Sequence, residues 1–423
     1  QCKESRTTIN SNSEEVMHAI KISRLKFWPT IFWVLVGLGL FSMVVRFTQG
    51  LGGATNLTDE FPWGLWIGFD VLCGVGLAAG GFVVAASVHI FNLHQYRSIL
   101  RPAIVTAFLG YVLVIVGLMF DLGRPWNIWH PIVLYWNPHS VMFEVGWCVI
   151  LYTTVLALEF SPMVFERLNL ERPQKILHTV TIPLVIIGVL LSSLHQSSLG
   201  SLYLIVPNKL YPLWYSSNLP YLFFVTAVAV GPAMVTIESY FSSRTFRREI
   251  ELPILSKLGK VTAASLAVYL VLKIEDIIDM KLYDYVFAIN FESAMYWAEI
   301  LFGVLTPIAL LSTTKIRQTK NGLFAAALFT AFGFVLNRLN ISLTALQQYS
   351  PGYFPSWMEV SITLMIAAIG FAAFWLAAKH LPVFPPQETR ATASPQAQEK
   401  DTVTFIDLPL ERVRDQHQLI PSE

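Results

Sequence analysis

Charged side chains are scarce in this 423-residue sequence. Asp, Glu, Lys and Arg make up 13% of it, against roughly 25% in ordinary soluble domains. The formal net charge is only +1, so no global field would attract an acidic polymer. Apolar residues make up 54%, and the mean hydropathy is +0.54. These figures exclude a disordered chain, a nucleic-acid binder and an ordinary cytosolic enzyme, and they predict a polytopic membrane protein.

Cysteine is equally scarce, because Cys2, Cys73 and Cys148 stand alone and form no CxxC pair. An iron–sulfur cluster takes about four thiolates, so we expect no cluster, no disulfide framework and no metal site. A b-type haem needs two axial ligands that face each other. The one deep histidine, His195, has no clear partner in the sequence. We therefore expect no intrinsic haem.

Long apolar runs dominate what remains of the sequence. A spanning helix needs about 20 mostly apolar residues, and this length predicts an all-α membrane domain over residues 28–380. The ten predicted transmembrane helices are 28–49, 63–93, 101–122, 139–160, 177–203, 219–241, 256–277, 291–313, 322–346 and 357–379.

Lys and Arg are distributed very unevenly between the two sides of these spans. Before the C-terminal tail, eighteen fall on the side of the N-terminus and three, Arg124, Lys209 and Lys281, on the other. Cytoplasmic loops carry the excess of positive charge. We therefore expect a multi-pass protein of the bacterial inner membrane with both termini in the cytoplasm. The polar segment 1–27 is then a cytoplasmic extension without a signal-peptide core, and 381–423 is a cytoplasmic tail.

Ionisable residues within the spans fall mostly in the half away from the cytoplasm. Such groups are costly in lipid and mark either a function or a buried pair. A pocket of acids and histidine walled by aromatic rings suits a lipid-soluble quinone, which needs an apolar slot, hydrogen-bond donors and proton carriers. The residues concerned in the outer half include Asp70, Asp121, His139, Glu144, His195, Lys273, Glu275, Asp276, Glu292, Glu299, Arg338 and Glu359.

Two structural interpretations stay open beside the functional one. Lys273, Glu275, Asp276, Arg338 and Glu359 would survive in lipid if they neutralised one another in a buried network. The polar run that begins at His195 must also find partners at membrane depth, either in a ligand or water or in a neighbouring helix.

Seven segments together resemble the NrfD/polysulfide-reductase-C family, and most closely its HybB-type membrane subunits of periplasm-facing nickel–iron hydrogenases. The resemblance covers residues 28–385. The segments are Phe61-Pro-Trp-Gly-Leu-Trp-Ile-Gly-Phe-Asp70, Gly-Leu-Ala-Ala-Gly-Gly81, Arg101-Pro102, Ser140-Val-Met-Phe-Glu144, Leu158-Glu-Phe-Ser-Pro162, His195-Gln-Ser-Ser-Leu-Gly-Ser201 and Phe354-Pro-Ser-Trp357.

The resemblance implies two four-helix bundles, at about 63–203 and 219–346, flanked by the first and last helices. It implies a subunit that binds menaquinone or a related quinone near the periplasmic face and is not catalytic alone. A ferredoxin-like iron–sulfur subunit would pass it electrons from the large and small subunits of a nickel–iron hydrogenase.

Carried over by motif, Glu144, Asp70 and His195 would transfer protons to the quinone. The outer-half cluster adds further residues as the expected pocket lining. These are Gln196, Trp66, His139, Asp121 and Arg338, beside His195 itself. Proton uptake from the cytoplasm would need a route through the inner half, for which Arg101, Glu159, His89 and Glu238 are the candidates.

Two alternatives remain at this point. The same fold serves complexes of multihaem cytochromes and of molybdopterin oxidoreductases. A secondary transporter or ion channel is the alternative of another class, although its charges should cluster at the midplane rather than toward one face.

Overall fold

The computed structural model describes residues 28–61, 63–350 and 352–384, and all of its regular secondary structure there is helical. Within those ranges, nine helical stretches are long and apolar enough to cross a membrane. They are Trp28–Gln49, Trp66–His89, His94–Asp121, Val141–Arg167, Glu171–Leu204, Leu219–Thr245, Phe291–Ser312, Lys320–Leu346 and Trp357–His380.

Helix α10 (Leu252–Asp279) corresponds to the remaining predicted span. It has 28 residues but carries charges near both ends, among them Lys260 and Lys273, so its uninterrupted apolar stretch is short. The all-helical membrane fold is confirmed, and the predicted count of ten agrees approximately. The predicted extension 1–27, and the tail 381–423 after its first residues, lie outside the described residues.

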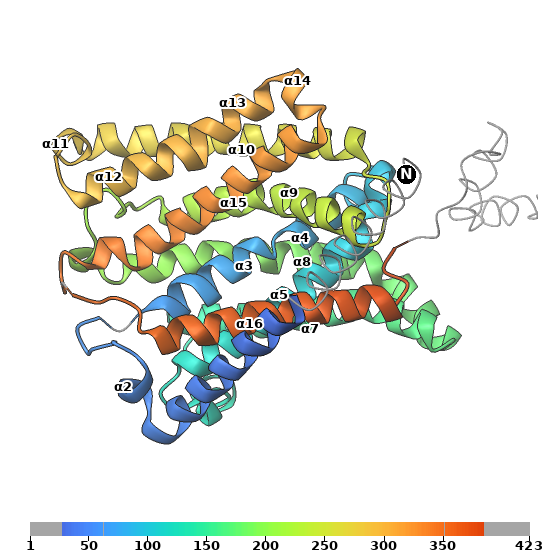
Figure 1. Cartoon of the computed structure of the whole chain (residues 1–423), viewed down its shortest axis with the longest axis horizontal. Coiled ribbons are helices and arrows are strands. Elements are labelled where there is room, and N and C mark those ends of the chain that lie inside the picture. The colour runs from blue at the N-terminus through green and yellow to red at the C-terminus, as the bar shows by residue number, and fades with distance from the viewer. Residues whose placement is uncertain (1–27, 62, 351, 385–423) are drawn as a thin grey trace, which may run out of the picture. The chain divides into compact units, whose positions relative to one another are not determined.

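The first bundle consists of four helical stretches that contact one another in a closed ring. The first stretch joins the π-helix η1 (Trp66–Cys73) to α3 (Gly74–Leu77) and α4 (Gly80–His89). The others are α5 (Arg97–Asp121), α7 (Val141–Arg167) and α8 (Glu171–Leu204). Contacts join α4 to α5, α5 to α7, α7 to α8, and α8 back to α4. The helices run roughly parallel to one another (Figure 1).

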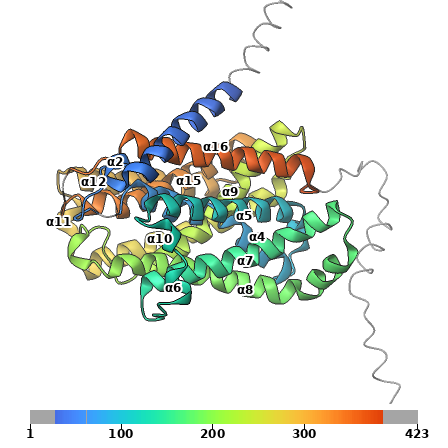
Figure 2. The same cartoon turned by 90° about the horizontal axis from the view of Figure 1, so that it is seen from below.

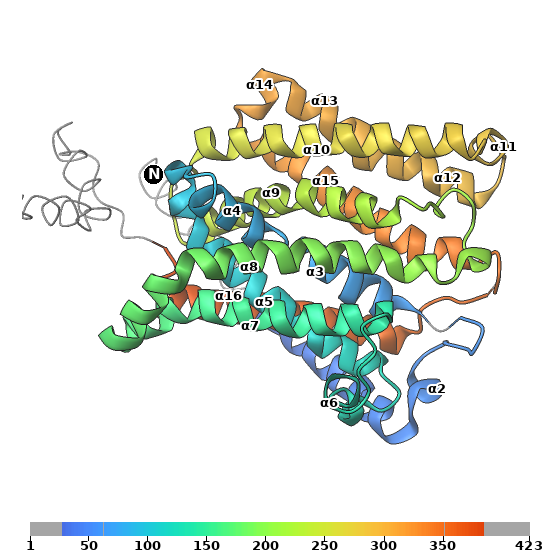
Figure 3. The same ribbon diagram turned by 180° about the vertical axis from the view of Figure 1, so that it is seen from behind.

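The second bundle is closed in the same way. Its members are α9 (Leu219–Thr245), α10, the stretch α12–η5–α13 (Phe291–Ala298, Glu299–Leu305, Thr306–Ser312) and α15 (Lys320–Ser342). Two glycines bring η5 and α15 together, because a Cβ on Gly333 would lie 2.0 Å from Cα of Gly303. Small residues allow this close approach of helices in lipid. Figure 3 shows α10, α9 and α8 lying side by side.

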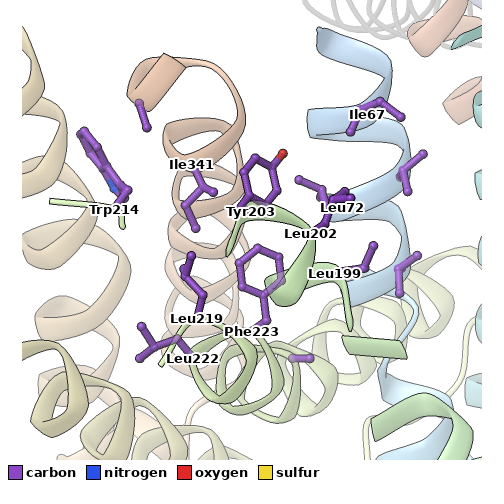
Figure 4. Close-up of a cluster of buried hydrophobic side chains, with 14 of the residues drawn as sticks. Ile67, Leu72, Leu199, Leu202, Tyr203, Trp214, Leu219, Leu222, Phe223 and Ile341 are labelled. Carbon is purple, nitrogen blue, oxygen red and sulfur yellow. The ribbon is translucent and has the colours of Figure 1, made fainter. Parts of the chain in front are cut away.

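The two bundles share one core. Helix α9 contacts α4 and α8, and α15 contacts η1. Tyr203 of α8 lies in this core between Ile341 of α15 and Leu72 of η1, with Phe223 of α9 beside it (Figure 4). Both bundles therefore meet along an apolar seam.

The first and last helices flank the first bundle. Helix α16 (Trp357–His380) packs on α5, and a capping box of Ser356 and Glu359 fixes its start. The N-terminal helix meets α16 where the Ser42 and Ser361 hydroxyls lie 2.7 Å apart. The N-terminal end of this helix leans away from the other helices (Figure 2). These two helices complete the predicted arrangement.

Candidate functional site

Helix α8 carries two adjacent, fully buried polar side chains, His195 and Gln196. Nδ1 of His195 lies 3.0 Å from the hydroxyl oxygen of Tyr111 on α5. In the part of the chain that the structure describes, Nε2 of His195 and both polar atoms of the Gln196 amide have no hydrogen-bond partner. Buried polar groups are nearly always hydrogen-bonded, so this turn of α8 is built for a ligand or internal water.

Further buried hydroxyls lie near this turn. The Tyr152 ring of α7 packs edge-on against Tyr111, with 4.7 Å between ring centroids. The Ser192 hydroxyl, one turn before His195, lies within interaction range of the Tyr111 and Tyr152 hydroxyls. Tyr203, two turns after Gln196, lies in the same way near the hydroxyl of Ser342. A row of buried polar side chains thus follows α8 through the first bundle.

Rings form the wall beside this row. Tyr203 packs edge-on against Trp63, with ring centroids 5.4 Å apart, and its ring is 6.4 Å from that of Phe223. These rings give the polar row of α8 an apolar side.

A second cluster lies where η1 meets the flanking helices. The Asp70 carboxylate accepts a hydrogen bond of 2.7 Å from Thr363 of α16, and its Cβ faces the space that Gly117 leaves on α5. Trp66 is fully buried and donates through Nε1 to the main-chain oxygen of Glu359, at 3.3 Å. Asp70 and Trp66 are therefore held in place by α16.

Asp121, at the end of α5, lies within electrostatic range of Arg46 and Glu359. Its Oδ1 is buried without a partner among the described residues. Arg46 donates instead to the main-chain oxygens of Phe120 and Leu122, at 2.7 and 2.6 Å. This guanidinium caps the carbonyl end of α5, which carries a partial negative charge.

The buried Glu359 side chain is satisfied by neutral donors. Tyr353 donates to it at 2.6 Å, and the main-chain N–H of Ser356 donates at 2.8 Å. Burial, together with its hydrogen bond to Glu359, raises the pKa of Tyr353, which therefore stays protonated and acts as the donor.

The second bundle holds its charges in the same manner. Glu299 of η5 accepts four hydrogen bonds of 2.9 to 3.0 Å, from Tyr269, Asn337, Trp214 and Asn340. A cavity of about 20 Å³ adjoins it, which is room for one water.

Arg338 is also buried and forms no ion pair among the described residues. Its guanidinium donates to Asn337, Thr226 and the main-chain oxygen of Phe223, and it lies 3.6 Å from the centre of the Phe223 ring. Lys273 donates to the main-chain oxygen of Leu213. Of the five charges expected to neutralise one another, none forms an ion pair with another in the described ranges. Neutral donors and acceptors replace that network.

Two of the predicted site residues lie on the surface. His139 and Glu144 are exposed, the latter in the first turn of α7. His195 and Gln196 lie inside the first bundle, Trp66, Asp70 and Asp121 lie against the flanking helices, and Arg338 lies in the second bundle. The residues predicted to line one quinone pocket therefore lie in several neighbouring parts of the structure.

The candidates for a proton route lie nearer the other end of the helices. Glu238 accepts from Thr106 at 2.7 Å, and Arg101 pairs with Glu166 at 2.8 Å. Glu159 and Tyr152 both face Gly188 of α8, since a Cβ there would lie 3.5 Å from Oε1 of Glu159 and 3.8 Å from Cε2 of Tyr152. His89 is half-buried at the end of α4.

Sequence reasoning missed Tyr111, Tyr152 and Thr363 as parts of these clusters. Each is a hydroxyl within an apolar span, which needs a partner at membrane depth. That requirement was the available signal, but it does not identify the partner.

Comparison with known proteins identifies the family to which the chain belongs. Residues 53–350 match the family model described as polysulphide reductase, NrfD. The chain belongs to the NrfD family. A Nitratidesulfovibrio vulgaris protein is 38% identical over 361 residues, covering 83% of this chain and 92% of its own length.

Two further relatives have names that state a complex. The probable Ni/Fe-hydrogenase 2 b-type cytochrome subunit of Escherichia coli K12 is 35% identical, over 84% of this chain and 92% of its own length. The menaquinone reductase integral membrane subunit of N. vulgaris is 29% identical, over 86% and 93%. The chain is thus an NrfD-family membrane protein similar to subunits of hydrogenase and menaquinone reductase complexes.

Proposed function

We propose that this NrfD protein is the quinone-reducing membrane subunit of a hydrogen-oxidising complex. Electrons would leave a periplasmic nickel–iron hydrogenase, cross a ferredoxin-like iron–sulfur subunit and reach menaquinone in the first bundle. The similarity to a hydrogenase subunit and to a menaquinone reductase subunit supports this assignment. The unequal Lys and Arg content of the loops supports cytoplasmic termini.

One observation carries the proposal, namely the buried and unpartnered Nε2 of His195 beside the unpartnered Gln196 amide. Menaquinone is an acceptor of two electrons and two protons. Its carbonyls need donors, which the Gln196 amide and the His195 imidazole can supply. The Tyr111 hydroxyl, 3.0 Å from Nδ1, orients the His195 ring and can exchange a proton with it. Trp63 and Tyr203 would line the apolar side of the slot.

We also propose that protons reach this turn from the cytoplasmic side. Glu159, Tyr152 and Tyr111 follow one another toward His195, and water in the gaps would complete the path. Arg101, His89 and Glu238 would serve its entrance. Asp70 and Glu144 remain proposed proton carriers on the outer side, Asp70 beside η1 and Glu144 at the surface.

Proton uptake from the cytoplasm would make turnover electrogenic. Moving one charge across the membrane involves about 2.3 kcal/mol per 100 mV. Sealed proteoliposomes that oxidise hydrogen and reduce menaquinone should therefore develop a membrane potential. If no potential forms and uncoupler does not change the rate, proton uptake from the cytoplasm is refuted. Only the quinone-reducing part of the proposal would then remain.

The test of quinone reduction uses the purified complex and two electron acceptors. His195→Leu removes a proton-transfer group and should lower hydrogen-dependent reduction of a menaquinone analogue by roughly 100-fold. Gln196→Leu removes a hydrogen-bond donor to the quinone and should lower it by roughly 100-fold as well. Reduction of a soluble dye, which takes electrons before the membrane subunit, should stay at the wild-type rate.

Ser193→Ala is the matched control, because Ser193 lies on the same helix and its hydroxyl bonds only to the main-chain oxygen of Val189. It should keep both activities. Wild-type quinone reduction in both leucine variants would refute the site. A complex that co-purifies with a molybdopterin or multihaem enzyme instead would refute the hydrogenase partner while leaving the quinone site standing.

A further inference from the structure

A polar pocket of about 410 Å³ opens at the end of the bundle opposite the predicted periplasmic face. It lies between the last turn of α7 and the end of α16. Its lining includes Glu166, Arg167, Asn169, Lys379, His380 and Pro382. Because both helices are membrane spans that end here, the pocket lies at the level of a bilayer surface.

Cationic groups dominate this pocket. Arg101 closes one side, donating to Glu166 and to the main-chain oxygen of Pro382, each at 2.8 Å. This pairing neutralises the one acidic side chain of the lining. Arg167 and Lys379 are exposed and form no ion pair within the described part of the chain. Among the described residues, the pocket therefore offers positive charge without a counter-ion.

Apolar side chains continue from the pocket along the membrane-facing surface. Lys379 folds back so that Nζ lies 5.0 Å from the centre of the Trp375 ring. Trp375, Leu376 and, further along α16, Phe371 are exposed, and so is Leu168 just after α7. A cationic pocket at the end of an exposed apolar stripe matches a molecule with a phosphate at one end and hydrocarbon chains at the other.

We propose that this pocket binds the phosphate group of an anionic phospholipid, with Arg167 and Lys379 as its ligands and the α16 stripe against an acyl chain. Basic pockets at the cytoplasmic ends of transmembrane helices bind such headgroups. Asn169 adds an amide at the rim, and Arg101 braces the floor through Glu166. Free phosphate shares the anionic chemistry but would gain nothing from the stripe.

The test measures thermal stability of the purified full chain in zwitterionic lipid as phosphatidylglycerol is added. The wild-type protein should be stabilised in a saturable manner, and by native mass spectrometry it should retain one phosphatidylglycerol that phosphatidylcholine does not displace. Arg167→Gln or Lys379→Gln should weaken the apparent affinity about 5-fold, and the double variant about 25-fold, because each basic residue near the surface is worth about 1 kcal/mol.

Lys315→Gln is the control, because it removes the same charge from an exposed position on α14 (Thr314–Arg317) in the second bundle. It should bind as the wild type does. Since all three positions are exposed, the variants should be equally stable without the anionic lipid. Equal affinity in the double variant and the control would refute the pocket. Equal stabilisation by inorganic phosphate at the same concentration would refute the lipid assignment.

Discussion

Replacing Glu299 with glutamine tests how the second bundle holds a charge without an ion pair. The carboxylate receives two donors on each oxygen: Tyr269 and Asn337 on Oε1, and Trp214 and Asn340 on Oε2. Glutamine keeps the shape but offers one acceptor atom, and its NH₂ group would point at two donors. Two of the four hydrogen bonds are therefore lost.

The expected cost follows from those two bonds. A hydrogen bond to a charged group contributes about 1.5–3 kcal/mol, so Glu299→Gln should lower the free energy of unfolding by about 3 kcal/mol or more. Reversible unfolding in mixed micelles measures this quantity. Glu292→Gln, at a half-buried position in the first turn of α12, is the matched control and should change stability by less than about 0.5 kcal/mol.

The result that refutes this reasoning is a Glu299→Gln protein as stable as the wild type. Glutamine would then reproduce the native hydrogen bonds. The four donors would in that case not all point at the carboxylate as described.

Three further predictions address packing, the surface carboxylate and the cofactor content. Gly333→Ala should destabilise the protein by about 1–3 kcal/mol, because its Cβ would overlap the backbone of Gly303, whereas Gly146→Ala meets open space and should be neutral in the same unfolding assay. Glu144→Gln should severely reduce hydrogen-dependent quinone reduction and leave dye reduction intact; an unchanged quinone rate would remove Glu144 from the proton path. The purified subunit should show no haem Soret band and no stoichiometric iron, and one b haem per chain would contradict this.

Most of the fold was accessible from the sequence because the bilayer sets the length of each span. Helix α10 illustrates the limit of that rule, since the charges near its ends shorten the apolar stretch although the helix is as long as its neighbours. The orientation stays a prediction, which rests on the accumulation of Lys and Arg on one side. Neither argument depends on knowing which helices touch.

The candidate site was predictable only in part. His195 and Gln196 stand out because polar groups in a span need partners. Tyr111, which holds His195, is 84 residues away in the chain, and Thr363, which holds Asp70, is 293 residues away. A lone hydroxyl in an apolar helix is indistinguishable by sequence from a core residue. The same ignorance of partners favoured an ion-pair network, whereas neutral donors bind Glu359 and neutral acceptors bind Arg338.

The central claim is that quinone binds at the His195–Gln196 turn of α8. The most direct test is photolabelling of the intact complex with an azido-menaquinone, followed by mass spectrometry of the labelled peptides. The label should fall within residues 192–203 of α8, be displaced by excess menaquinone, and be lost in Gln196→Leu but not in Ser193→Ala. A displaceable label that maps to the second bundle, or that persists in Gln196→Leu, would contradict the account.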